Sequence, residues 1–115
     1  MNSQNPPNKH ELPSAQAVDL AAIFKYVDGA VVSRTLLKRT NGSITLFAFD
    51  EGQGLSEHTS TSDALAHFLE GQAEVVVSGQ QLTAKSGDVI LLPANQPHSL
   101  KAVTKFKMLL TMIRP

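Results

Sequence analysis

The chain of 115 residues is long enough for one domain, and its ten basic side chains are balanced by ten acidic ones. This zero net charge disfavours nucleic acid or an anionic membrane as partner, and no apolar run approaches the roughly 20 residues that span a bilayer. The absence of cysteine excludes disulfides and thiolate ligands, and the N-terminus lacks a secretory signal pattern, so we expect a cytoplasmic protein.

The first 14 residues are polar, include His10 and three prolines, and predict a flexible tail before a single domain over residues 15–115. Apolar residues at helical spacing between Val18 and Phe24 predict a short helix of one or two turns. Asp28 and Gly29 then mark a turn.

From Ala30 onward apolar and polar residues alternate with period two, which is typical of β-strands. Asn41-Gly42 predicts a two-residue hairpin turn after the first of these strands. The next strand, Ser43 to Asp50, is apolar on both faces, which is typical of a strand between two packed layers or at a subunit interface. For this reason we expect a homodimer.

Short strands and turns continue to the C-terminus. They are expected at Asp63–Glu70, Gln72–Ser78, Gln81–Ala84, Asp88–Leu92, His98–Val103 and Phe106–Ile113. One face of the last strand carries Phe106, Met108, Leu110 and Met112. Short strands with turns every 8–12 residues predict an all-β sandwich or barrel.

The stretch from Gly87 to His98 has a glycine turn, an apolar strand and then two prolines. Pro93 and Pro97 lack amide donors, so the backbone between them leaves the regular hydrogen-bond ladder. His98 is thereby placed at the start of the next strand.

Two glycine–histidine patterns resemble the sequence motifs of the cupin family. Gly52, five residues, His58 and a closing Gly71 resemble the first motif, G-x5-H-x-H-x3,4-E-x6-G. Gly87, five residues, Pro93 and then His98 resemble the second, G-x5-P-x-G-x2-H-x3-N. Fifteen residues separate Gly71 from Gly87, as in small single-domain cupins, and the resemblance extends over residues 30–113.

This resemblance implies a double-stranded β-helix, which is a jelly-roll barrel of two antiparallel sheets and is commonly dimeric. In metal-binding members two histidines and a glutamate of the first motif join the histidine of the second around one ion of Fe, Mn, Ni, Zn or Cu.

The chain departs from that ligand set at two positions. His58 and His98 remain, but Ser60 stands at the second histidine position and Ala64 at the glutamate position. Catalytic zinc sites usually keep three protein ligands, and non-haem iron sites use two histidines and a carboxylate. The second motif is also altered, with Asn95 for its glycine and Ala102 for its asparagine. A divalent metal on the two histidines and a metal-free polar patch therefore both remain open.

Asp63 lies next to the vacant glutamate position. Adjacent residues of a strand point to opposite faces, so Asp63 becomes a metal ligand only if a bulge reverses it, and otherwise it caps a turn or the strand start. The same alternation directs His67 away from the interior, where we expect it to be hydrogen-bonded or at an interface.

We therefore expect a cupin-domain protein that binds a small, largely apolar ligand, with or without one carboxylate or carbonyl group. The expected lining is His58, Ser60, Ala64, Ala66, Phe68, His98, Leu100, Met108 and Met112. The alternative is a metal-dependent enzyme of dioxygenase or isomerase type, in which water completes the coordination of an ion on His58 and His98. A third hypothesis is a barrel that serves only dimerisation or sensing. No nucleophile–base pair and no phosphate-binding glycine loop stands out, so no catalytic residue is assigned.

Overall fold

The structure is a computed structural model and describes residues 11–115, so most of the expected tail, with His10, lies outside the described residues. Within residues 11–115 there are nine strands and one turn of 3-10 helix, η1 (Leu20–Ala22). The strands are β1 (Val31–Arg39), β2 (Gly42–Phe49), β3 (Gly54–His58), β4 (Asp63–Glu70), β5 (Gln72–Val77), β6 (Gln80–Lys85), β7 (Val89–Leu92), β8 (His98–Ala102) and β9 (Phe106–Ile113). No helix in this part of the chain is long and apolar enough to cross a membrane.

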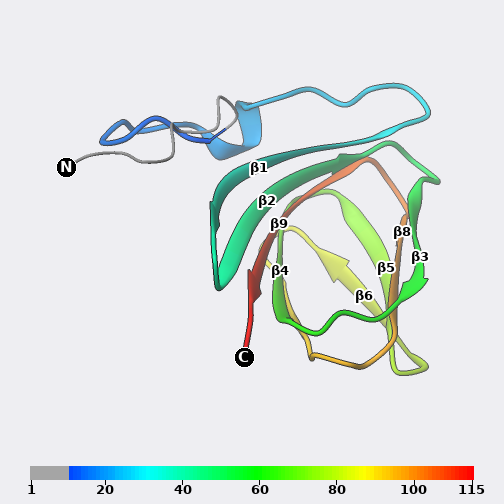
Figure 1. Ribbon diagram of the computed structural model, residues 1–115. Helices are drawn as coiled ribbons and strands as arrows, with labels where there is room; N and C mark the ends of the chain where they lie inside the picture. The colour runs from blue at the N-terminus through cyan, green and yellow to red at the C-terminus, as the bar shows by residue number, and fades with distance from the viewer. Residues whose placement is uncertain (1–10) are drawn as a thin grey trace.

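The strands form two antiparallel sheets that curl around a common core (Figure 1). One sheet has the order β1-β2-β9-β4-β7, and the other has the order β3-β8-β5-β6. Strands far apart in the sequence are neighbours, such as β2 beside β9 and β3 beside β8. This arrangement confirms the predicted all-β jelly-roll barrel.

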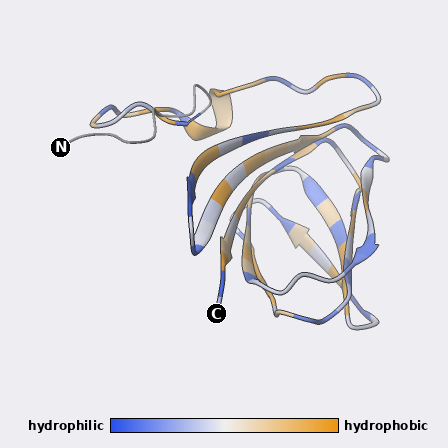
Figure 2. Ribbon diagram, in the orientation of Figure 1, coloured by the Kyte–Doolittle hydropathy of each residue, from blue (hydrophilic) through white to orange (hydrophobic). Residues whose placement is uncertain are grey.

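Alternate residues of most strands fill the space between the sheets, and hydrophobic and polar segments accordingly alternate along the ribbon (Figure 2). On β4, Ala64, Ala66 and Phe68 are buried, whereas the residues between them are at least partly exposed. Phe106 stacks on Phe49 with ring centroids 4.3 Å apart and lies 5.8 Å from the ring of Phe68. These rings fill the end of the barrel at the C-terminal ends of β2 and β4, which we call the closed end. The four β9 residues predicted to share a face all belong to this core or pack against it.

The segment before β1 covers part of the outer face of the larger sheet. Leu46 and Ala48 point outward by their register with β9, yet they are only 0% and 1% exposed. Beside them Lys107 is buried, its ammonium donates to the carbonyl oxygen of Ala21, and it lies 5.0 Å from the centroid of the Tyr26 ring. The strand that is apolar on both faces therefore lies between two packed layers of its own chain.

Some local features differ from the sequence-based expectations. The predicted helix is a single three-residue 3-10 turn. The strand β3 was not predicted, because Leu55 is its one apolar residue and a single residue shows no alternation. At the N-terminal side, the amide of Leu12 donates to the carbonyl of Leu36 at 3.0 Å, so this part of the expected tail lies against β1.

The first hairpin turns one residue earlier than predicted. Thr40 and Asn41 form the turn, and Gly42 is already paired with Arg39 in the sheet. A Cβ atom on Gly42 would lie 2.8 Å from the carbonyl oxygen of Met112. The glycine is thus required by the close approach of β9 and not by the turn.

Candidate functional site

A β-bulge in β3 turns His58 toward the inside of the barrel. Leu55 pairs with Leu100 and His58 pairs with His98, so three steps along β3 match two steps along β8. Residues three apart in a regular strand point to opposite faces, whereas residues two apart share one face. The extra residue therefore places His58 on the same face as Leu55, which packs against the core.

The two expected histidines are direct cross-strand neighbours. Their ring centroids lie 4.4 Å apart, and the ring planes meet at 69°. His58 ends β3 and His98 begins β8, so both lie at the end of the barrel opposite the phenylalanine cluster. We call this the open end. The structure thus brings together two residues that are 40 positions apart in the sequence.

Backbone carbonyls hold both imidazoles in one tautomer. Nδ1 of His58 lies 2.7 Å from the carbonyl oxygen of Ser56, and Nδ1 of His98 lies 3.2 Å from that of Gln96. A carbonyl oxygen only accepts hydrogen bonds, so each Nδ1 carries the proton and donates. Each neutral ring therefore keeps Nε2 as an acceptor or metal ligand.

The two rings differ in their exposure to solvent. His98 is 7% exposed, whereas His58 is exposed. Burial lowers the pKa of His98, and the neighbouring His58 lowers it further, against the opposing effect of the hydrogen bond to Gln96. His98 is therefore uncharged at neutral pH, and its Nε2 accepts.

Ser60 and Asp63 connect the loop after β3 to the loop after β7. The Ser60 hydroxyl oxygen accepts from the amide of Ser62 at 3.1 Å, and the Ser60 carbonyl accepts from the amide of Asn95 at 2.7 Å. Asn95 has a φ of 64°, the left-handed conformation that the motif glycine would adopt. The Asp63 carboxylate accepts from the amide of Ala94 at 2.9 Å. Both loops are thereby held in place around the histidines.

The donors at this site fit part of a metal centre. Two imidazoles that share one ion must both direct Nε2 at it from ~2.1 Å, which requires adjacent rings. The rings of His58 and His98 are adjacent, with centroids 4.4 Å apart. However, no group of three or more His, Cys, Asp or Glu side chains suited to a metal exists in residues 11–115. Ala64 occupies the glutamate position, and His67 lies on the outward side of β4.

The expected apolar lining is divided between the core and the open end. Ala64, Ala66, Phe68, Leu100 and Met108 are members of the buried core. Met112 is partly buried and lies at the open end, where it lines two cavities of about 290 and 150 Å³. Sequence reasoning missed the polar residues of the smaller cavity, because they come from four segments that no local pattern connects.

Comparisons with known proteins agree with this fold. The family model described as "Cupin domain" matches residues 45–114. A conserved protein of unknown function from Streptococcus pyogenes is 33% identical, with a TM-score of 0.89, and the alignment covers 99% of this chain and 98% of that one. A cupin superfamily protein from Desulfitobacterium hafniense is 28% identical, with a TM-score of 0.86 and coverage of 91% and 96%. A Cupin 2 conserved barrel domain protein from Leptotrichia buccalis is 34% identical, with a TM-score of 0.82 and coverage of 84% and 47%. No curated protein matches the chain.

Proposed function

The chain belongs to the cupin family, and from this premise we propose that it binds a small, largely apolar ligand at the open end of the barrel, against His58, Ser60 and His98. The observation that carries the proposal is the pair of adjacent imidazoles, whose Nδ1 atoms are held by backbone carbonyls while both Nε2 atoms have no described partner. A few convergent polar groups beside an apolar wall are the common form of a small-molecule site.

The tautomer of the two rings determines how a polar group of the ligand binds to them. The neutral Nε2 of His98 accepts a hydrogen bond, so a hydroxyl binds without any change in protonation. A carboxylate offers no donor, and it binds when one imidazole takes up a proton. Its affinity therefore rises as the pH falls, whereas the affinity for the matching alcohol does not rise.

Hexanol and hexanoate are suitable probes, because they share a hydrocarbon chain and differ in the polar group. Calorimetric titrations of untagged protein at about pH 6 and about pH 8, on either side of the ordinary histidine pKa, test both expectations. We expect His98→Gln to weaken both ligands by on the order of tenfold, which corresponds to one lost hydrogen bond. His67→Gln is the matched control, since His67 lies on the outer side of the barrel. The proposal fails if neither probe binds saturably or if both substitutions have the same effect.

A metal-dependent activity is the second candidate, and the adjacency of the two rings and their shared tautomer favour it. Imidazole suits Fe, Ni, Cu and Zn, but the two histidines alone do not complete such a centre. The ligand-binding proposal predicts far less than one metal ion per chain when protein purified without a polyhistidine tag is subjected to elemental analysis. A stoichiometric ion that is lost in His98→Ala supports the metal-dependent alternative instead.

A further inference from the structure

A small basic cavity lies at the open end of the barrel, away from the strands that carry the histidine pair. Its volume is about 150 Å³, and it is lined by Lys38, Arg39, Gly42, Ser43, Ser62, Met112 and Arg114. These residues come from the end of β1, the start of β2, the loop before β4 and the end of β9 with the residue after it. Neither His58 nor His98 lines it.

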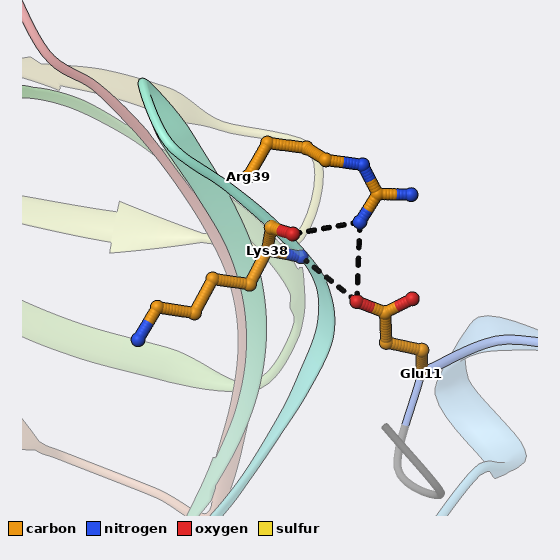
Figure 3. Close-up of polar contacts among 3 residues, drawn as sticks. All are labelled: Glu11, Lys38 and Arg39. Carbon is orange, nitrogen blue, oxygen red and sulfur yellow. Dashed lines mark hydrogen bonds and ion pairs between the residues drawn. The ribbon is translucent and has the colours of Figure 1, made fainter. Parts of the chain in front are cut away.

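The charge of this basic cavity is positive and incompletely balanced. Glu11 pairs with Arg39 at 3.2 Å and also accepts from the amide of Lys38 at 3.4 Å. Figure 3 shows Glu11 and the Arg39 guanidinium on one side of β1, and the Lys38 ammonium on the other side. Within residues 11–115, no carboxylate pairs with Lys38 or with Arg114. Asp63, next to the lining in sequence, directs its carboxylate to the amide of Ala94.

The cavity also offers two hydroxyl donors. Ser43 pairs with Lys38 across the first hairpin and with Met112 of β9, so it lies between these two lining residues. Ser62 is only 8% exposed, and its hydroxyl has no bonding partner in the part of the chain that the structure describes. Cations beside hydroxyl groups are the donor set that binds phosphate or carboxylate oxygens.

The volume limits the size of the occupant. The cavity measures only about 150 Å³. Pockets for drug-sized ligands measure about 300–1,000 Å³. The cavity therefore fits one oxyanion group and not a whole cofactor.

We propose that the basic cavity is an oxyanion site, in which Lys38 and Arg114 supply the charge and Ser43 and Ser62 donate from their hydroxyls. Neither histidine lines the site, and it binds either a free anion or the anionic group of a larger molecule that extends out of the open end.

The test is an amide-resolved NMR titration of untagged protein with inorganic phosphate and, separately, with acetate, at constant ionic strength balanced by chloride. We expect saturable shifts at the amides of Lys38, Ser43 and Ser62 with at least one of the two anions. Binding of both anions shows that the site recognises oxyanions in general, and binding of only one shows whether the site is specific for phosphate or for carboxylate. Lys38→Gln and Arg114→Gln should each weaken binding by on the order of tenfold, as expected for a charged hydrogen bond.

Lys101→Gln is the matched control, because it removes the same charge from an exposed position on β8. Equal weakening by the control and by the cavity variants would show a general charge effect and overturn the proposal. It is also overturned if neither anion gives saturable shifts, or if the shifts centre on His58 and His98. The last outcome leaves the ligand-binding proposal intact, so the failure of one proposal is distinguishable from the failure of the other.

Discussion

Gly71 and Gly52 give a sharp test of the packing that closes the barrel, because they share one backbone conformation and differ in the space beside Cα. Both have a φ of +82°, the left-handed region that residues with a Cβ rarely adopt. A Cβ on Gly52 would meet nothing within 4 Å. A Cβ on Gly71 would lie 1.9 Å from the carbonyl oxygen of Lys105 and 2.7 Å from both Cα and Cβ of Phe106.

These distances set the expected losses of stability. An alanine in the left-handed conformation costs about 1–2 kcal/mol, and this loss applies to both sites. At Gly71 the obstructing atoms are mostly backbone, and Phe106 is fully buried against Phe49 and Phe68, so the start of β9 has to move. Overpacking of this kind adds about 1–3 kcal/mol. We therefore expect Gly71→Ala to lose about 2–5 kcal/mol and Gly52→Ala about 1–2 kcal/mol.

Urea unfolding followed by circular dichroism measures both losses, since the midpoint falls as the free energy of unfolding falls. A domain at the lower end of the usual range of about 5–15 kcal/mol of stability survives the smaller loss and is marginal after the larger one. Failure of Gly71→Ala to fold, while Gly52→Ala folds, agrees with the reasoning. Equal midpoints for the two variants would refute it, because the start of β9 would then move away from residue 71 without any loss of stability.

Two further predictions concern the histidine and the outer surface. Because the folded state lowers the pKa of His98 below its ordinary value of about 6.5, the unfolded state binds the proton more readily, so the free energy of unfolding should fall as the pH falls through 6.5. His98→Gln should flatten that slope in urea titrations across this range, and an unchanged slope would contradict the assigned burial. We also propose that the chain forms a homodimer through the outer face of β4 and β7, where Leu65, Val89 and Leu91 are 43%, 51% and 59% exposed. Sedimentation should show a dimer for the wild type and a monomer for Leu91→Lys, and a monomeric wild type at all concentrations would refute this assembly.

The sequence alone was sufficient for the fold class and for the inner faces of most strands. Period-two alternation is a local property, so the sides of β4 and β9 that face the core could be read before any partner strand was known. The spacing of Gly52, His58, Gly71, Gly87 and His98 also indicated the family, because turn glycines and a strand-end histidine recur at set distances along the chain.

Contacts between distant segments were decided by the tertiary structure. The bulge that turns His58 inward exists only in the register between β3 and β8, and β3 carries too little apolar character to be recognised alone. Alternation along β9 places Lys107 on the face away from the core, yet the segment before β1 buries it. Four segments meet to form the basic cavity around Lys38 and Arg114. The physical reason is that burial and charge balance depend on which strands are neighbours, and a local pattern specifies the face of a strand but not its partner.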